Sequence, residues 1–278
     1  MMINQTTVIV RGAGDLATGT IHCLSSCGFK VAALEVSRPT TIRRTVAFSE
    51  AMYQNEVCVE GVIAKKAVSP EMIEQCWNSG IVPVLEDSRG HWIDRLKPHI
   101  VIDAIIAKKN LGTNKSMAPL VIGLGPGFTA GEDVHVVIET QRGHRLGRII
   151  TEGCAMPNTG IPGSIAGVGK ERVIHSPDAG IMHNIRRIAD IVHKDEMIAC
   201  VGDTPVYASI SGILRGLLKD GLYVSKGFKI ADIDPRISEK ENCFTISDKA
   251  RTIAGGVLQA ILIYGDGHMN AESEQSRI

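Results

Sequence analysis

The sequence predicts an α/β protein in which a parallel sheet with crossover helices is followed by a mainly β part and a closing C-terminal helix. Three observations lead to this fold class. An apolar run near the start of the chain ends in a glycine turn within Val8–Gly19. Strand-like and helix-like segments then alternate through the first half, which is typical of parallel sheets. The last third contains an internal repeat of short strands.

The glycine turn has the layout of a βαβ nucleotide-binding unit. Gly12 and Gly14 follow the first strand, the third glycine is displaced from the usual spacing to Gly19, and the next strand-like run ends near Glu35. Glycines let backbone N–H groups approach a phosphate, and an acid at this distance accepts from ribose hydroxyls. Asp15 would repel a passing phosphate. A structural turn without a nucleotide is the alternative to cofactor binding by Gly12, Gly14, Asp15, Gly19 and Glu35.

Turn and cap residues mark the elements of a Rossmann-like α/β domain, which is predicted to span residues 1–109. A helix begins with serine as N-cap and proline at the first helical position, at Ser69–Pro70, and Gly80 ends it. The other predicted elements are a helix over 40–53 and strands over 56–60, 81–85 and 99–104.

A glycine-rich β region is predicted over residues 110–170 and contains a second candidate binding loop. Its glycines, among them Gly125 and Gly127, are more numerous than a hairpin requires. Either the backbone passes close to a ligand, or several residues adopt positive φ. The loop is followed by Arg142, His144 and Arg145, which could form an anion site because arginine binds phosphate bidentately. An exposed basic hairpin is the alternative.

Cys154 is the candidate reactive residue. It lies in a loop with glycine and proline neighbours, where we expect an exposed thiol. A thiolate there could hold or relay sulfur or selenium as a persulfide or selenylsulfide. A buried loop cysteine that only packs is the alternative. No metal site is predicted, because the histidines and cysteines lack metal-ligand spacing.

The last third repeats itself at a constant offset. Gly180-Ile181-Met182 recurs as Gly212-Ile213-Leu214, and Val192-His193-Lys194 recurs as Val224-Ser225-Lys226. Two interleaved copies would bury a core that neither buries alone. The pattern resembles the barrel-sandwich hybrid of biotinyl and lipoyl domains, without a lysine at the junction for a covalent cofactor. We predict a barrel-sandwich-like module over 171–236, used as a scaffold or ligand surface.

Residues 237–278 are predicted to form a C-terminal helix and tail. Ser247 is the expected N-cap of a helix that reaches Tyr264, and the polar tail from Gly265 is expected to fray.

Composition disfavours several function classes. The chain has 278 residues with 30 basic and 30 acidic side chains, so it offers no basic stripe for nucleic acid. No apolar run approaches the roughly 20 residues of a membrane helix, and no signal peptide is evident. The scattered cysteines form no CxxC pair, as expected of reduced thiols. We therefore expect a cytoplasmic protein that binds neither nucleic acid nor membrane.

Four stretches together resemble one family. They are Val10–Gly19, Gly123–His144, Glu152–Gly160 and Lys229–Arg236. The combination is similar to the YqeB-type (EF2563-type) proteins of the selenium-dependent molybdenum hydroxylase system, over nearly the full chain. The N-terminal part also resembles the Rossmann domain of XdhC-type molybdenum cofactor chaperones.

The resemblance implies an accessory role in the maturation of a selenium-dependent molybdenum hydroxylase. It implies a molybdopterin-type cofactor or nucleotide as ligand, sulfur or selenium as the transferred atom, and a hydroxylase subunit as partner. Two other functions stay open. One is an NAD(P)-dependent oxidoreductase that uses Gly12, Gly14 and Glu35, and the other is a non-catalytic assembly scaffold. The sequence is compatible with a homo-oligomer but does not decide the oligomeric state.

Overall fold

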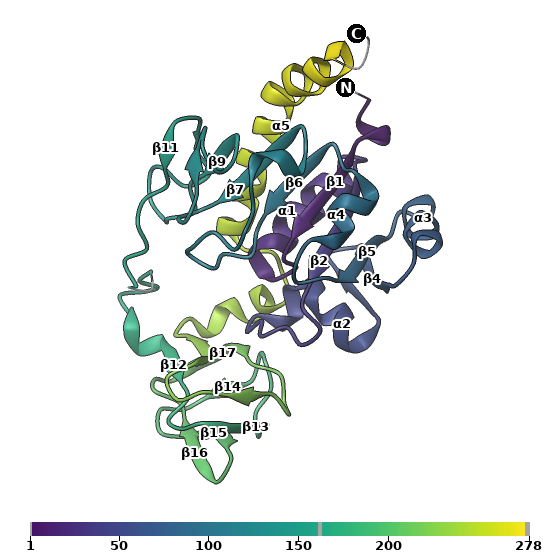
Figure 1. Cartoon of the computed structure of the whole chain (residues 1–278). Coiled ribbons are helices and arrows are strands. Elements are labelled where there is room, and N and C mark those ends of the chain that lie inside the picture. The colour runs from purple at the N-terminus through teal and green to yellow at the C-terminus, as the bar shows by residue number, and fades with distance from the viewer. Residues whose placement is uncertain (1, 161–162, 276–278) are drawn as a thin grey trace. The chain divides into compact units, whose positions relative to one another are not determined.

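The computed structural model describes residues 2–160 and 163–275, which form two compact units (Figure 1). Unit 1 takes its described residues from Met1–Pro39, Ala47–Asn158 and Ile246–Ile278, and unit 2 from Thr40–Val46 and Thr159–Thr245. This division differs from the predicted ranges 1–109, 110–170, 171–236 and 237–278. The reason is that three strands after residue 109 belong to the sheet of the first unit, and the C-terminal helix packs against that sheet.

Unit 1 is built on a nine-stranded sheet. Seven neighbouring strands run parallel, and one antiparallel strand lies at each edge. In spatial order the strands are β10 (Ile149–Ile150), β9 (Val136–Ile138), β7 (Leu120–Leu124), β6 (Ile100–Asp103), β1 (Thr7–Arg11), β2 (Lys30–Glu35), β5 (Val82–Glu86), β4 (Val62–Ala67) and β3 (Glu56–Val59). The α/β class and the large parallel sheet are confirmed.

Helices cover both faces of this sheet (Figure 1). They are α1 (Asp15–Ser26), α2 (Ala51–Gln54), α3 (Pro70–Asn78), α4 (His91–Leu96) and α5 (Asp248–Gln275). On one face, Ile73 of α3 and Trp92 of α4 pack with Ile9, Leu34 and Val101 of the strands. On the other face α5 packs against α1 and against β7 and β9. Among the described residues, no helix is both long and apolar enough to cross a membrane.

The predicted helix caps are present. The Ser69 hydroxyl accepts from the Met72 amide at 3.3 Å, and the Ser247 hydroxyl accepts from the Ala250 amide at 3.2 Å. The C-terminal helix is therefore confirmed, but α5 continues beyond Tyr264 to Gln275. The residues after Tyr264 include no proline and several good helix formers, which allows the helix to continue.

The predicted helix over 40–53 is also wrong. The segment contains two 3₁₀ turns, Arg44–Val46 and Phe48–Glu50, before the short helix α2. Its backbone groups bond to other segments: the Ser49 amide donates to the Ala13 carbonyl, and the Ile42 carbonyl accepts from the Leu217 amide. Hydrogen bonds to distant segments thus take the place of the i to i−4 hydrogen bonds of a helix.

Unit 2 consists of two four-stranded sheets whose strands pair antiparallel. The first sheet is β12 (Val173–His175), β19 (Lys229–Asp234), β17 (Gly212–Leu217) and β14 (Ile191–Val192). The second is β16 (Thr204–Tyr207), β15 (Met197–Val201), β13 (Gly180–Asn184) and β18 (Tyr223–Val224).

The two repeat copies of unit 2 interleave. Gly180 of the first copy pairs with Val224 of the second, and Gly212 of the second pairs with Val192 of the first. Equivalent residues therefore occupy equivalent places, and each sheet contains strands of both copies. The assignment to the barrel-sandwich hybrid class stays a prediction.

Candidate functional site

The glycine turn lies at the carboxyl end of β1, in the middle of the parallel sheet. Since β1 has β2 on one side and β6 on the other, the strand order reverses here, which is where open parallel sheets bind ligands. Gly12 has a φ of +98°, and a Cβ at this position would lie 3.0 Å from the Ala104 carbonyl oxygen. Gly14 is the N-cap of α1, and Asp15 is its first residue.

Glu35 holds the glycine turn from within. Its carboxylate accepts from the Ala13 amide at 2.9 Å and from the Val36 amide at 2.8 Å. Burial raises the pKa of Glu35, and the two N–H groups oppose this change. In dinucleotide-binding folds an acid at this place binds the ribose. Here its oxygens are engaged by the turn itself.

A buried network joins the ends of β1 and β6 next to the turn. Arg11 ends β1, Asp103 ends β6, and their side chains are 3.4 Å apart. The Thr113 hydroxyl donates to Asp103 at 2.5 Å and also contacts Arg11. Burial raises the pKa of Asp103, against the effects of Thr113, the Ile105 amide and the Arg11 charge. The amino-acid sequence did not predict this network, although an acid at the end of a parallel strand is a recognisable signal.

Lys249 connects two sites that the sequence predicted separately. It is half-buried in the first turn of α5. Burial lowers the pKa of Lys249, as does the charge of Arg142, whereas Asp15, Glu139 and Asp248 raise it. Asp15 belongs to the glycine turn and Arg142 to the predicted anion site. One lysine therefore lies within electrostatic range of both.

The close packing of α1 and α5 places Lys249 beside the turn. A Cβ at Gly19 would lie 2.7 Å from the Cβ of Ala250, the residue after Lys249. The segment 142–148, which carries Arg142, His144 and Arg145, is called the arginine hairpin below. Its Gly147 approaches α5 in the same way, because a Cβ at Gly147 would lie 2.7 Å from the Thr252 carbonyl oxygen. Gly19, predicted to bind a cofactor, thus faces a helix.

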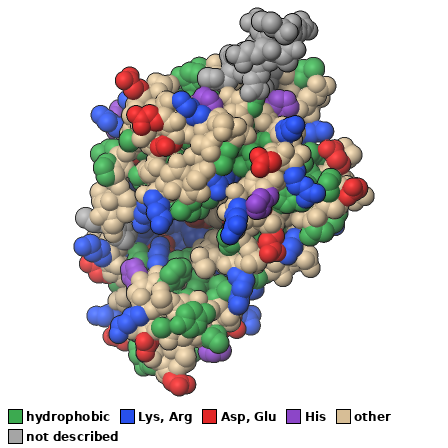
Figure 2. Space-filling view, viewed as in Figure 1, with side chains coloured by type: hydrophobic (Ala, Val, Ile, Leu, Met, Phe, Trp, Pro, Cys, Tyr) green, Lys and Arg blue, Asp and Glu red, His purple; other side chains and the backbone are tan. Residues whose placement is uncertain are grey.

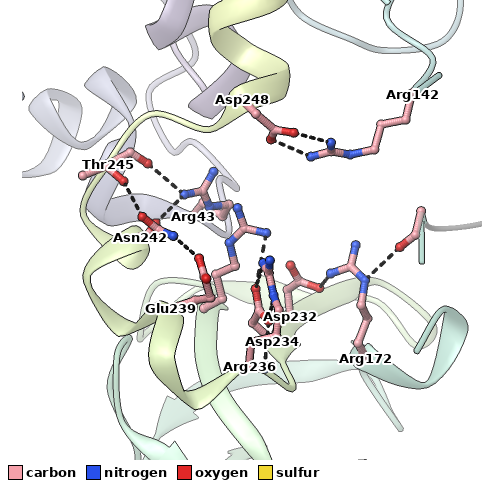
Figure 3. Close-up of polar contacts among 12 residues, drawn as sticks. Arg43, Arg142, Arg172, Asp232, Asp234, Arg236, Glu239, Asn242, Thr245 and Asp248 are labelled. Atoms are coloured by element: carbon pink, nitrogen blue, oxygen red, sulfur yellow. Dashed lines mark hydrogen bonds and ion pairs between the residues drawn. The ribbon is translucent and has the colours of Figure 1, made fainter. Parts of the chain in front are cut away.

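The arginine hairpin is fastened to the start of α5. Arg142 makes two hydrogen bonds to Asp248, at 2.7 and 2.9 Å (Figure 3). His144 lies 3.3 Å from the Arg148 guanidinium, and the Arg145 carbonyl accepts from the Arg148 amide. Arg142, His144 and Arg145 are all exposed. On the face of the protein in Figure 2, acidic and basic side chains are interspersed.

The glycines of the second loop pack against the chain itself. A Cβ at Gly125 would meet the Thr140 side chain, and one at Gly127 would lie 2.8 Å from the Lys109 backbone nitrogen. Both residues also have a positive φ, +79° at Gly125 and +112° at Gly127, which is the second of the two explanations that the sequence left open.

Cys154 has an exposed thiol, as expected. It lies in the two-stranded sheet of β11 (Gly153–Cys154) and β8 (Thr129–Ala130), with its Sγ 3.4 Å from the Thr129 hydroxyl. The strand is anchored two residues further on, where the Met156 amide donates to Glu139 at 2.8 Å. In the described part of the chain, no group of three or more His, Cys, Asp or Glu residues is arranged to hold a metal ion.

The amino-acid sequence was compared with known proteins. It is 50% identical over 256 residues to a protein of Escherichia coli (strain K12) described as "Uncharacterized protein YqeB", a match that covers 92% of this chain. The chain is similar to YqeB over nearly all of its own length. It spans about half the length of that protein, because the match covers 47% of YqeB. This likeness supports the YqeB-type family that four sequence stretches indicated. No family model matches the chain.

Solved structures show only distant likeness to this chain. TcdA (CsdL) matches 47% of this chain and 52% of its own with a TM-score of 0.29 and 16% identity. EutE (DoeB) from Ruegeria pomeroyi matches 82% of this chain and 85% of its own, with a TM-score of 0.26 and 9% identity. An aspartoacylase family protein from Mesorhizobium loti matches 83% of this chain and 86% of its own, with a TM-score of 0.28 and 11% identity. Such low TM-scores carry no argument about fold or function.

Proposed function

We propose that this protein binds a phosphate-bearing cofactor, of the molybdopterin type or a nucleotide, and assists sulfur or selenium insertion into a molybdenum hydroxylase. The observation that carries the proposal is the packing of α5 on α1, which brings the first turn of α5, with Lys249 and the Arg142–Asp248 pair, towards the strand-order reversal of the sheet. The molybdenum and selenium part rests on the sequence resemblance.

The local charges suit an anion. The N-terminus of α1 presents backbone N–H groups without helical acceptors and carries a partial positive charge. Lys249 adds an amine, and the exposed Arg142 guanidinium already binds the carboxylate of Asp248 in a bidentate manner. A phosphate has the geometry to take the place of that carboxylate. The negative charge of Asp15, the first residue of α1, would repel a ligand with many negative charges.

Cys154 supplies the transfer chemistry in this proposal. Its thiolate attacks the outer sulfur of a donor persulfide, the donor thiolate leaves, and the sulfur stays on Cys154 as a persulfide. A selenium donor reacts in the same way to give a selenylsulfide. The exposed position of the thiol allows a donor to approach.

Native mass spectrometry with elemental analysis tests the proposal, on protein from cells fed molybdate and selenite. The wild type is expected to retain a pterin species with molybdenum, and selenium or sulfur on the Cys154 peptide. Lys249→Met should reduce cofactor retention by about tenfold or more, because a charged contact is lost. Lys226→Met, at an exposed lysine of unit 2, should retain it. A cofactor-free wild type, or full retention by Lys249→Met, would contradict the proposal.

An NAD(P)-dependent oxidoreductase is less well supported. That function would use Glu35 to accept from the ribose, and both carboxylate oxygens of Glu35 already accept backbone N–H groups. Saturable NAD(P) binding with turnover would favour it nevertheless.

A non-catalytic scaffold is the second candidate, and one observation favours it. The sheet of β16, β15, β13 and β18 exposes Tyr223 at 69% and its pairing neighbour Ile181 at 48%, and apolar surface of this kind occurs at protein interfaces. Cys154→Ala separates the two functions. Binding of the hydroxylase subunit together with lost hydroxylase activity argues against a pure scaffold.

A further inference from the structure

Arg215 of unit 2 carries a largely buried guanidinium that makes no hydrogen bond to the described residues. Its side chain is 13% exposed, and its Nε is buried without an acceptor in the part of the chain that the structure describes. Its ion pair with Asp234 is long, with 4.0 Å between Nη1 and the carboxylate oxygen. Buried donors nearly always have an acceptor in folded proteins. An unsatisfied guanidinium edge is therefore a candidate binding group for an anion.

A β-bulge sets the direction of Arg215. In the pairing of β17 with β19, Leu214 lies opposite Ile233 and Gly216 lies opposite Asp232, so Arg215 is an extra residue in β17. Bulges redirect a side chain and are common beside binding sites. The direction of this guanidinium thus does not follow from the regular alternation of side chains along a strand.

Positive charge also approaches the bulge from the segment Thr40–Val46, which belongs to unit 2. The Leu217 amide donates to the Ile42 carbonyl at 2.9 Å. Arg44, two residues after Ile42, donates from its Nε to the Leu217 carbonyl at 2.8 Å. A second guanidinium therefore lies next to the strand residues that follow the bulge.

The two buried carboxylates of this strand pair are already engaged. Asp232 and Asp234 are two residues apart on β19, so their side chains share one face of the strand. Asp234 accepts two hydrogen bonds from the Arg236 guanidinium, at 2.9 and 2.8 Å, and Asp232 pairs with Arg172 (Figure 3). Arg215 is thus the third arginine for two carboxylates. A positive charge that is removed from water is costly unless an anion balances it.

We propose that Arg215 is the centre of a second anion site, on unit 2, which binds a phosphate group. Its Nη1 lies towards Asp234, which leaves the edge formed by Nε and Nη2 for two parallel hydrogen bonds to phosphate oxygens. Arg44 adds positive charge, and Arg236 neutralises Asp234, which weakens the repulsion between that carboxylate and the ligand. These residues all belong to unit 2, so the site is separate from the anion site proposed for unit 1.

Isothermal titration calorimetry with inorganic phosphate, at constant ionic strength, tests the site on the full chain. Every protein in the series carries Lys249→Met, which removes the lysine of the anion site proposed for unit 1. This parent chain should bind phosphate saturably. Arg215→Met should weaken the binding about tenfold or more, because two charge-assisted hydrogen bonds are lost. Arg187→Met, at an exposed arginine of the same unit, is the matched control and should bind as the parent does.

Arg215→Lys separates the charge of the side chain from its geometry. Lysine keeps the positive charge but has no planar fork for two parallel hydrogen bonds, so the affinity for phosphate should fall about threefold or more. Thermal unfolding without phosphate shows whether each variant is folded.

A second measurement changes no residue of unit 2. It is ¹H–¹⁵N NMR of the arginine side chains in the parent chain, with the Nε–H signal of Arg215 assigned by its loss in Arg215→Lys. This signal should shift on addition of phosphate with the same midpoint as the heat of binding. The signal of Arg187 should stay in place.

Titration with glycerol phosphate distinguishes two sources of the phosphate group. Tighter binding of the ester indicates an organic phosphate, and tighter binding of the ion indicates free phosphate. No saturable binding of either probe, an unmoved Arg215 signal, or equal affinity of the parent and a folded Arg215→Met would overturn the proposal. The series lacks Lys249 and contains no cofactor, so a failure of the function proposed for the glycine turn leaves these results intact.

Discussion

At the glycine turn, a backbone N–H group donates a hydrogen bond to a carboxylate of the protein itself. Glu35 accepts from the Ala13 amide, so the chain stabilises its own turn without a ligand. A preformed turn of this kind costs a ligand little ordering free energy on binding.

Loss of Glu35 should destabilise unit 1. In Glu35→Ala the amides of Ala13 and Val36 both lose a charged acceptor, which should lower the free energy of unfolding by about 1.5–3 kcal/mol. Glu86 ends the adjacent strand in register with Glu35 but is exposed, so Glu86→Ala should cost less than about 1 kcal/mol. Urea unfolding measures both, and equal losses would show that the turn does not depend on this carboxylate.

Lys249 should give stability a defined pH dependence. Its pKa is lowered in the folded protein, so above that pKa the unfolded chain binds more protons than the folded one. Stability should then rise with pH until the unfolded lysine also deprotonates, near about pH 10.4. In Lys249→Met this contribution is absent.

The measurement is the difference in unfolding free energy between wild type and Lys249→Met from pH 7 to 10. The difference should move in favour of the wild type as the pH rises, by at most about 1.4 kcal/mol per pH unit. A constant difference would mean that burial of Lys249 does not govern its titration.

Among the elements, α1 and α5 depend on one small residue for their close approach. Gly19→Ala would place a methyl group against Ala250, and overpacking should cost about 1–3 kcal/mol. Ala250→Gly in the same chain should recover part of the loss, because the space returns. Gly255→Ala is the control on α5, where a Cβ meets no atom within 4 Å, and should be neutral or stabilising by about 0.5–1 kcal/mol. Thermal unfolding of the wild type and these three variants distinguishes packing from helix propensity.

Local signals predicted the elements whose structure is decided locally. The cap at Ser69, the stop at Gly80 and the parallel order around Gly12 followed from turn chemistry and from alternating patterns. The segment 40–53 was mispredicted because its backbone bonds to Ala13 and Leu217, which no local pattern reveals. The strand β4 was missed because two consecutive lysines, Lys65 and Lys66, interrupt its apolar pattern, and the helix α4 was missed because it has only six residues.

The candidate site was predictable in part. Gly12, Gly14, Asp15 and Arg142 were found because each belongs to a motif of glycines or basic residues. Lys249 could not be found, since only the docking of α5 on α1 brings it to the turn. Glu139 has a local signal, an acid directly after a buried apolar strand, and this signal is weaker than those of the glycine loops.

At the scale of the whole molecule, the chain passes repeatedly between the two units. Unit 2 includes the early segment Thr40–Val46. Within unit 2, Arg43 of this segment donates to the carbonyl groups of Asn242 and Thr245 at 3.1 Å each (Figure 3). A few residues from the start of the chain are thus part of the structure of the second unit.

Substitution of Arg43 should therefore destabilise unit 2 selectively. Arg43→Met removes donors from two carbonyl groups, and a loss of about 1–3 kcal/mol is expected. Arg187→Met, at an exposed arginine of the same unit, should change stability by less than about 0.5 kcal/mol. Hydrogen exchange resolved by peptide measures each unit separately. Faster exchange in the strands of unit 1 rather than unit 2 would refute the assignment.

The docking of α5 against α1 also bears on the order of events during protein synthesis. The glycine turn is translated before the helix that brings Lys249 to it, and most of the described chain lies between the two. Contacts of such long sequence separation form late, because the intervening chain must first be ordered. A nascent chain that has folded its first strands therefore has no lysine at the turn. If the proposed cofactor binds at this turn, it would bind only after α5 has been translated, and incompletely synthesised chains would not compete for it.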